Sequence, residues 1–136
     1  MTFGRHGGKY MGNFLAVTVG GGIGAALRYW MAGAIASLTP GSFPVAILIV
    51  NILGSFLMGL LTESFALKFS AGPEVRSFLT AGILGGFTTF SSFSLEAGVL
   101  IRRDDFLAAG AYVFLSVALS ISALFLGLWL VRILVD

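Results

Sequence analysis

The sequence predicts an all-α membrane protein with four transmembrane helices, the third of which is broken in the middle of the membrane. The first observation is composition: 57% of the 136 residues are hydrophobic and 10% are charged. A soluble domain carries charge at about a quarter of its positions, so this chain has too little polar material to cover a soluble surface. The second observation is a set of four apolar runs, each long enough to cross a bilayer, which takes about 20 residues.

The four predicted spans are separated by short linkers. The spans cover residues 13–37, 44–67, 75–101 and 106–135. The linkers contain Pro, Gly and Ser or, in the last case, the charged run Arg-Arg-Asp-Asp, and such residues end helices and form turns. Connections this short join antiparallel neighbours in a helical bundle. We therefore predict a polar N-terminal leader over residues 1–12 and a single four-helix transmembrane domain over residues 13–136.

Charge and residue usage exclude several function classes. The eight Lys and Arg residues are scattered and form no basic stripe interleaved with aromatics, so we expect no nucleic-acid partner. Cysteine is absent and the single histidine, His6, lies in the leader, which excludes a His/Cys metal site. Because no pairing of a nucleophile with a base is visible either, we expect neither an enzyme nor an organic cofactor.

The basic residues give only a weak signal for orientation in the membrane. On the N-terminal side of the bilayer we place Arg5, Lys9, Lys68, Arg76 and Arg132, against Arg102 and Arg103 on the other side. The count is five against two, and it falls to three against two if translation starts at Met11. Since the side richer in Lys and Arg stays in the cytoplasm, a bias this weak permits insertion in both orientations.

Small residues recur at four-residue intervals inside the spans. The pairs are Gly20/Gly24, Ser55/Gly59 and Gly82/Gly86, a spacing that lets membrane helices approach closely. The first pair also belongs to a G-x-G-x-x-A match. A dinucleotide site would need a preceding strand and a following acidic residue, and no acidic residue occurs before Glu63. Helix packing is therefore the better interpretation.

Polar side chains inside the spans are the candidates for function. A charge in the middle of a membrane costs at least about 2.5–3.5 kcal/mol, so Arg28 either snorkels from a helix end or faces a helix interface or vestibule. Asn51 forms a helix–helix hydrogen bond or lines a pore. In the last span Tyr112, Ser116 and Ser120 are four residues apart, which places them on one helix face. We interpret these three as a polar track, with chance spacing as the alternative.

The third span carries the most unusual segment, residues 85–96, GGFTTFSSFSLE. Each of Gly85 and Gly86 weakens the helix by about 1 kcal/mol relative to alanine. A broken helix is tolerated at membrane depth only where protein or a cavity covers the freed backbone. The freed carbonyls could hold a cation, and hydroxyls could supply the missing local partners. These hydroxyls belong to Thr88, Thr89, Ser91, Ser92 and Ser94.

Phe90 and Phe93 lie three residues apart among these hydroxyls. An aromatic ring is positive at its edge, so a ring edge can meet an anion without a fixed charge. Conduction needs sites that bind weakly enough to release the ion, and a fixed Lys or Arg would hold an anion too tightly. The segment therefore suits a small anion, although phenylalanines at this spacing also occur in ordinary helix packing.

The sequence resembles the Fluc family of fluoride channels, also called CrcB proteins. The likeness covers nearly the whole chain from Met11 onward and is most specific in the third span. The matching residues are Gly24 to Tyr29, Val50 with Asn51, Gly54 with Ser55, Gly85 to Glu96, and the set Tyr112, Ser116 and Ser120. Two adjacent positions depart from the family: Ala46 and Ile47 replace a common Gly-Thr pair, so one hydroxyl of the usual pathway is missing.

The resemblance implies a passive, fluoride-selective channel that exports fluoride from the cytoplasm across the bacterial inner membrane. The protein is expected to be an antiparallel, dual-topology homodimer with two pores. A structural Na⁺ would lie on the dimer axis, held by the backbone carbonyls of Gly85 and Thr88. The implied anion pathway comprises Asn51, Thr89, Phe90, Ser91, Phe93, Ser94, Glu96, Tyr112, Ser116 and Ser120.

Two other function classes fit a small four-span protein. A dual-topology multidrug exporter is also dimeric, but it typically binds its cations with a glutamate in the first span, and here the first acidic residue is Glu63. A structural membrane subunit would explain the small-residue pairs but not the rows of hydroxyls. The fluoride channel is the interpretation that uses both features.

Overall fold

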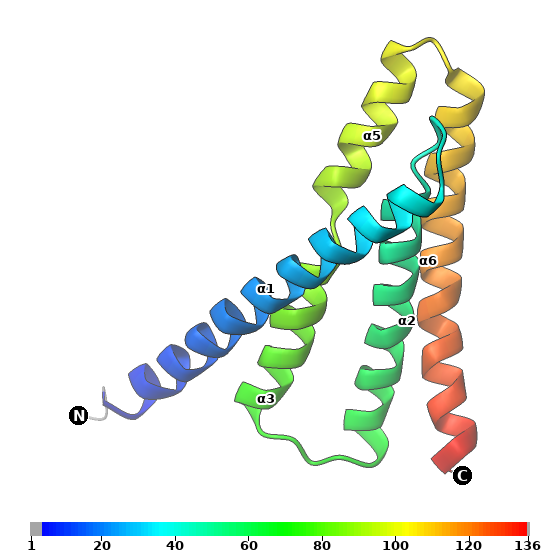
Figure 1. Cartoon of the computed structure of the whole chain (residues 1–136). Helices are drawn as coiled ribbons and strands as arrows, with labels where there is room; N and C mark the ends of the chain where they lie inside the picture. Colours follow the sequence, from blue (N-terminus) through cyan, green and yellow to red (C-terminus); the bar gives the residue numbers. More distant parts are fainter. Residues whose placement is uncertain (1–3, 136) are drawn as a thin grey trace.

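The computed structural model describes residues 4–135 and shows an all-helical chain (Figure 1). The third span is made of several helical pieces, while each of the other spans is one continuous helix. The elements are α1 (Gly4–Leu38), α2 (Val45–Leu67), α3 (Pro73–Ser77), the π-helical stretch η1 (Phe78–Leu84), α4 (Gly85–Phe87), α5 (Phe90–Arg102) and α6 (Phe106–Val135).

The prediction of four membrane-spanning helices is confirmed. Four helices in the described part of the chain are long and apolar enough to cross a bilayer, namely Gly7–Leu38, Val45–Leu67, Pro73–Arg102 and Phe106–Val135. The last coincides with the predicted span. The first helix begins at Gly4 rather than Asn13, so most of the predicted leader continues α1 as helix. Residues 4–12 contain four glycines, which weaken a helix, but no proline, which would break it.

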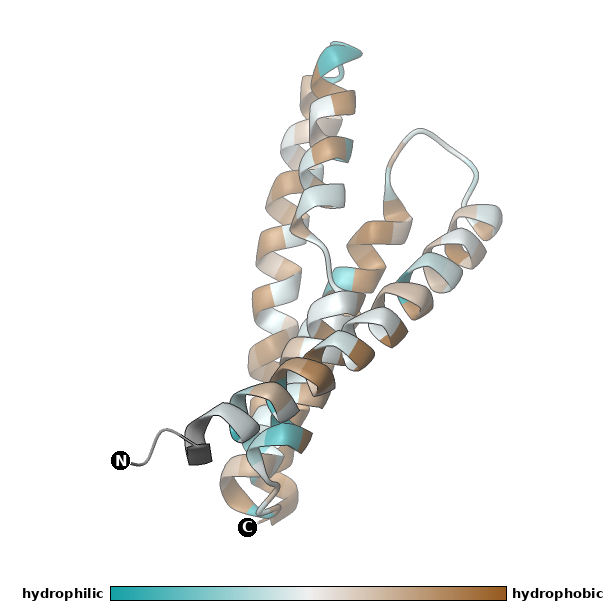
Figure 2. Ribbon diagram, turned by 90° about the vertical axis from the view of Figure 1, so that its left-hand side faces the viewer, coloured by the Kyte–Doolittle hydropathy of each residue, from teal (hydrophilic) through white to brown (hydrophobic). Residues whose placement is uncertain are grey.

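The helices cross rather than form a parallel bundle. In Figure 1, α2 and α6 run side by side, and α1 crosses obliquely in front of the third span. Helix α5 is tilted toward the end of the molecule where α6 begins. Both termini and the α2–α3 loop lie at one end of the molecule, and the α1–α2 loop and the α5–α6 corner lie at the other. Figure 2 shows hydrophobic residues along all the helices and a hydrophilic corner between α5 and α6.

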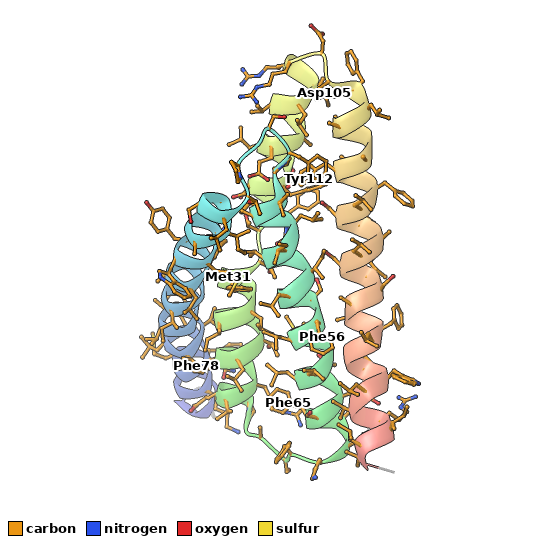
Figure 3. The ribbon with its side chains drawn as sticks, turned by 45° about the vertical axis from the view of Figure 1, so that its right-hand side comes forward. Met31, Phe56, Phe65, Phe78, Asp105 and Tyr112 are labelled. Carbon is orange, nitrogen blue, oxygen red and sulfur yellow. The ribbon has the colours of Figure 1, made fainter. Side chains whose placement is uncertain are left out.

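Local hydrogen bonds define the helix ends. Pro73 opens α3 at a position where a helix needs no N–H donor. At the start of α6, the Ala108 N–H donates to Asp105 Oδ1 over 3.2 Å. The α2–α3 loop is held by Arg76, which donates to the carbonyl oxygens of Ala71 and Phe65 and lies 5.4 Å above the Phe65 ring. Figure 3 shows Phe65 near this end of α2.

Glycines allow the closest helix contacts. A Cβ atom at Gly82 would lie 3.0 Å from the Cα of Gly20, so α1 and η1 touch through their backbones. At Gly59 a Cβ would overlap the Leu124 carbonyl of α6. The prediction that these small residues serve helix packing is confirmed for the five glycines of the three pairs, whereas Ser55 lines a cavity described below.

An ion pair that the sequence analysis did not identify joins α2 to α6. Arg132 donates from Nε and Nη2 to Glu63 Oε1 over 2.9 and 2.6 Å. The Glu63 carboxylate is buried, whereas the Arg132 side chain is largely exposed. The buried carboxylate is thus neutralised by an arginine that reaches it from the surface, near the end of the molecule that holds both termini.

Candidate functional site

The third span is broken, as the sequence predicts, but the break lies at Thr88 and Thr89 and not at Gly85 and Gly86, where the glycines suggested it. The helix passes through Gly85, whose φ and ψ are −64° and −37°, and α4 ends at Phe87. Thr88 and Thr89 then adopt extended conformations with ψ of 156° and 119°. Gly86 serves a different purpose, because a Cβ there would overlap the Gly21 carbonyl of α1.

Threonine side chains satisfy the two helix ends at the break. Thr88 Oγ1 donates to the Leu84 carbonyl over 2.9 Å, which closes the end of α4. Thr89 is the N-cap of α5, and its Oγ1 accepts the Ser92 N–H over 3.2 Å. An N-cap of this kind stabilises a helix by about 1 kcal/mol. The hydroxyls of the GGFTTFSSFSLE segment therefore supply local partners for freed backbone groups.

A cavity of about 410 Å³ lies beside the break, between α2, α5 and α6. It brings together many of the predicted anion-pathway residues from three separate elements. These are Asn51, Thr89, Phe90, Phe93, Ser116 and Ser120, and Thr88 of the predicted cation site also contributes. No Lys, Arg, Asp or Glu belongs to the described lining, so the cavity offers hydroxyls, an amide and ring edges but no fixed charge.

Two serines of α6 line this cavity and carry hydroxyls without a hydrogen-bond partner within residues 4–135. Ser116 Oγ and Ser120 Oγ are buried, and neither has a hydrogen-bond partner among the described residues. An unsatisfied buried hydroxyl costs about 1–3 kcal/mol. Both side chains line the cavity, so an anion or water held there would recover this free energy. Their shared helix face agrees with the predicted polar track.

Phe90 and Phe93 lie against each other at the cavity, with ring centroids 5.2 Å apart and planes inclined at 51°. Their environments differ sharply, because Phe93 is 9% exposed and Phe90 is 77% exposed. Phe93 also contacts the Tyr112 ring at 5.4 Å. The Phe93 ring is thus packed inside the chain, while the Phe90 ring is presented on its surface.

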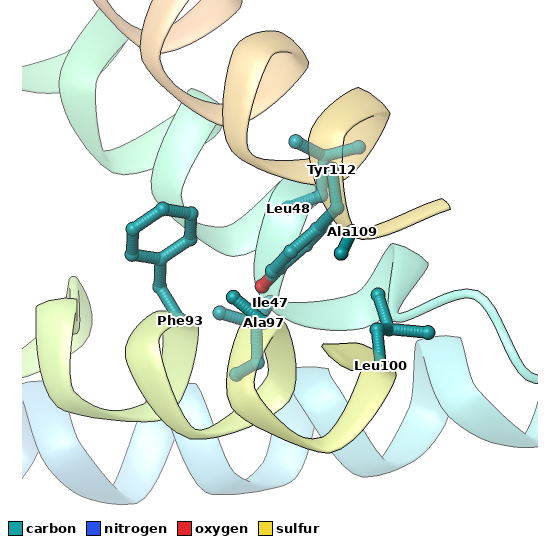
Figure 4. Packing of buried hydrophobic residues seen from close by; sticks show 7 residues of the cluster. All are labelled: Ile47, Leu48, Phe93, Ala97, Leu100, Ala109 and Tyr112. Carbon is teal, nitrogen blue, oxygen red and sulfur yellow. The ribbon is translucent and has the colours of Figure 1, made fainter. Parts of the chain in front are cut away.

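Tyr112 connects this cavity to a second one. Its side chain is fully buried in a cluster with Ile47, Leu48, Phe93, Ala97, Leu100 and Ala109. Figure 4 shows Tyr112 reaching from α6 into this cluster, with its hydroxyl oxygen near Ala97. The hydroxyl donates to Glu96 Oε2 over 2.6 Å. The hydroxyl of Tyr112 is therefore already bonded, unlike those of Ser116 and Ser120.

The second cavity has a volume of about 640 Å³ and lies between α1, α2 and α5. Arg28, Ser92 and Glu96 supply its polar lining, and Ala46 and Ile47 form part of its apolar wall. Arg28 therefore borders a space between helices, as expected for a charge at an interface or vestibule. Glu96 lies here and not with the other predicted pathway residues, so the structure divides the candidates between two cavities.

Ser91 and Ser94 line neither of these two cavities. Both are exposed. Ser94 Oγ donates to the Phe90 carbonyl of its own helix over 2.9 Å, and Ser91 Oγ lies 3.3 Å from Thr89 Oγ1. Within a single subunit their hydroxyls serve local hydrogen bonds.

Sequence reasoning quoted Gly54 and Ser55 of α2 as matches to the family but did not assign them to the pathway, and it also missed the apolar lining residues Met58, Val117, Ile121 and Leu124. A signal was present, since Ser55 lies four residues after Asn51 and so shares its helix face. Gly54 provides clearance, because a Cβ there would overlap Thr88 Cγ2. The α2 surface is therefore shaped to fit the break.

Asn51 makes the helix–helix hydrogen bond that was one of its two predicted roles. Its Nδ2 donates to the Thr89 carbonyl over 3.0 Å, and its Oδ1 accepts the Thr89 N–H over 2.8 Å. Asn51 also lines the first cavity. It therefore makes the predicted helix–helix hydrogen bond and lies where a pore-lining amide would be.

The break also frees carbonyl groups that fit a hard cation. Among the described residues, no backbone N–H outside α4 donates to the carbonyls of Gly85 or Thr88. Gly85 is exposed. Na⁺, like other hard cations, prefers oxygen ligands, so carbonyls without a backbone partner are the kind of ligand that the cation implied by the resemblance would need.

Comparison with known proteins gives a consistent result. The family model described as "CrcB-like protein, Camphor Resistance (CrcB)" matches residues 15–128. A protein of Chelativorans sp. (strain BNC1) named "Fluoride-specific ion channel FluC" is 51% identical over 122 residues, covering 90% of this chain and 98% of its own. The proteins of the same name in Hyphomonas neptunium and Methylobacterium nodulans are 48% and 51% identical, over 90% and 88% of this chain.

Proposed function

Because the chain belongs to the CrcB family, we propose that it is a passive, fluoride-selective channel and not an enzyme. The observation that carries this proposal is the first cavity, whose lining combines two serines with unpartnered hydroxyls and two phenylalanines and contains no charged residue among those described. Fluoride is a small, strong hydrogen-bond acceptor. Hydroxyl donors and positive ring edges can replace part of its hydration shell and still release it.

In the proposed pathway, fluoride passes along Ser116 and Ser120 of α6 and between Phe90 and Phe93. Thr89 and Asn51 border the same cavity. Tyr112 packs on Phe93 and donates to Glu96, so it would orient both the ring and the carboxylate at the next step of the path. Arg28 lines the same second cavity as Glu96, where its charge would attract anions to the entrance. Ser91 and Ser94 would contribute from the exposed face of α5.

We infer that two copies assemble as an antiparallel, dual-topology homodimer with two pores. The exposure of Phe90 supports this, because a ring that is 77% exposed cannot enclose an anion without a neighbouring surface. The weak imbalance of Lys and Arg between the two ends is compatible with insertion in both orientations. In a bacterial inner membrane, passive transport down a gradient would export fluoride from the cytoplasm.

A structural Na⁺ at the dimer axis is also part of the proposal. The carbonyls of Gly85 and Thr88 would hold it. When bound, the ion supplies a positive charge that stabilises freed carbonyls close to the anion path. The residues of the break then keep the phenylalanine rings in place on α5.

The proposal is tested with purified protein in liposomes loaded with fluoride and, in parallel, with chloride. We expect fast fluoride release, recorded with an ion-selective electrode, and no chloride release above that of protein-free liposomes. Release of neither ion from folded protein would contradict the channel, and equal release of both would contradict its selectivity.

Replacing Ser116 and Ser120 together by alanine is expected to slow fluoride efflux about tenfold. Each hydroxyl is a buried donor on the cavity, and a hydrogen bond contributes about 0.5–1.5 kcal/mol, or more to a charged partner. The efflux rate from liposomes measures the effect. The matched control is Ser37→Ala, an exposed serine that bonds its own helix in α1, which should leave efflux unchanged. A double variant as fast as the unmodified protein would contradict the track.

A further inference from the structure

Asn51 lies where the second span meets the break in the third. We propose that Asn51 is a positioning residue that keeps the third span broken, by taking the Thr89 N–H that a continuous helix would give to the Gly85 carbonyl. The inference rests on the proposed function for its consequence, because the released carbonyl is one of the two proposed ligands of the structural cation.

The two hydrogen bonds of Asn51 carry the first step. In an α-helix each N–H donates to the carbonyl four residues earlier, so Thr89 would donate to Gly85. Instead the Thr89 N–H donates to Asn51 Oδ1 over 2.8 Å, and Asn51 Nδ2 donates back to the Thr89 carbonyl over 3.0 Å. The side-chain amide thus pairs with both backbone groups of Thr89, as a neighbouring strand would in a β-ladder.

The burial of Thr89 means that its N–H must find a partner within the protein. Thr89 is 7% exposed, so water is poorly placed to satisfy its N–H. A buried backbone donor is almost always paired. Two acceptors therefore compete for it, the Asn51 amide and the Gly85 carbonyl. With Asn51 present the helix stays open, and without it the donor is best satisfied by rejoining α4 to α5.

The neighbouring residue Gly54 explains how Asn51 can reach the break. Gly54 follows Asn51 by one turn of α2, and a Cβ there would overlap Thr88 Cγ2 and lie 3.2 Å from the Phe87 ring. The absence of a side chain brings α2 close enough for the amide to contact Thr89. Asn51 and Gly54 thus act together as a template for the extended backbone of the break.

The consequence reaches both ions of the proposed function. Thr89 is the N-cap of α5, and Phe90 and Phe93 lie in the first turns of that helix, so the ring positions depend on where the break lies. On the N-terminal side of the break, the Gly85 carbonyl is free only while the Thr89 N–H is bonded to Asn51. One side chain therefore couples the geometry of the anion cavity to the availability of a cation ligand.

The test compares Asn51→Leu, which removes both hydrogen bonds at similar size, with Asn51→Asp, which keeps an acceptor for the Thr89 N–H. Ser116→Ala, a change on the same cavity, is the matched control. The thermal unfolding midpoint of purified protein is recorded against Na⁺ concentration, with N-methyl-D-glucamine as the replacement cation. This measurement does not depend on fluoride transport.

We expect the unmodified protein, Ser116→Ala and Asn51→Asp to be stabilised by Na⁺. Asn51→Leu should need at least tenfold more Na⁺ for half of that stabilisation, or show none. A crystal structure of Asn51→Leu should show the Thr89 N–H donating to the Gly85 carbonyl. An unchanged Na⁺ response, or a break that stays open in that structure, would overturn the proposal.

Failure of the inference and failure of the proposed function give different results. If the unmodified protein releases no fluoride but Asn51→Leu closes the break, the role of Asn51 stands and the channel does not. If fluoride is released and Asn51→Leu responds to Na⁺ like the unmodified protein, the channel stands and the role of Asn51 is wrong. If Asn51→Leu does not fold, loss of the Na⁺ response in Asn51→Asp would count against the acceptor role.

Discussion

Phe93→Ile is expected to lose fluoride efflux while the protein still folds and assembles. Isoleucine is smaller than phenylalanine but keeps an apolar side chain at a position that is 9% exposed, and it has no ring edge to present to an anion. The variant also loses the contacts of Phe93 with the Phe90 and Tyr112 rings, at 5.2 and 5.4 Å. Aromatic pairs of this kind contribute about 0.5–1.5 kcal/mol each beyond the burial of area. The rate of fluoride release from liposomes measures the effect.

Phe90→Ile is expected to have the same effect on efflux for a different reason. The Phe90 ring is 77% exposed, so its replacement removes little packing within the subunit and reports mainly on the anion contact. Phe114→Ile is the matched control, since Phe114 is 70% exposed on α6 and lies outside the first cavity. Size-exclusion chromatography checks assembly. Unchanged efflux in both Phe90→Ile and Phe93→Ile would show that the rings do not contact the anion.

Hydropathy was sufficient to predict the four spans because each is a continuous apolar run with a polar or glycine-rich boundary. The α5–α6 corner was located correctly, since Arg102 to Asp105 interrupt the apolar pattern and Asp105 caps the next helix. The position of the break was only approximately predicted. The sequence pointed to Gly85 and Gly86, yet these stay helical, and Thr88 and Thr89 are the extended residues.

The reason for this difference is a contact that local sequence does not contain. Gly86 remains in a helix because its small size serves packing against Gly21, and Thr89 leaves the helix because Asn51 takes its N–H. Asn51 and Thr89 are 38 residues apart in the sequence, and Glu63 and Arg132 are 69 apart. Spacing rules describe one helix at a time, so they found the Tyr112, Ser116 and Ser120 face and the Phe90/Phe93 pair.

The division of the candidate residues between two cavities has the same origin. Glu96 and Phe93 lie within one turn of α5, but Phe93 borders the cavity toward α6 and Glu96 borders the one toward α1. The first cavity is bordered by α6 and the second by α1, so the neighbouring helix, and not the spacing along α5, decides which cavity each residue borders. Tyr112 links the two groups of residues, because its ring packs on Phe93 and its hydroxyl donates to Glu96.

Gly59→Ala is expected to destabilise the protein strongly, whereas Gly110→Ala should be neutral or slightly stabilising. At Gly59 an added Cβ would overlap the Leu124 carbonyl of α6, and at Gly127 it would overlap the Phe56 carbonyl of α2. At Gly110 nothing lies within 4 Å of an added Cβ. The two variants make the same chemical change, so the difference between them isolates the helix contact.

The size of the effect follows from what the added methyl group meets. Both contacts are with backbone atoms, which cannot rotate aside as a side chain can, so α2 and α6 must move apart. Overpacking of a well-packed interior costs about 1–3 kcal/mol, and helices in lipid are held together mainly by close packing. At Gly110 only helix propensity changes, which favours alanine by up to about 1 kcal/mol. The free energy of unfolding in detergent should therefore fall in Gly59→Ala and stay the same or rise slightly in Gly110→Ala. Equal stability of the two variants would show that α2 and α6 are not in backbone contact.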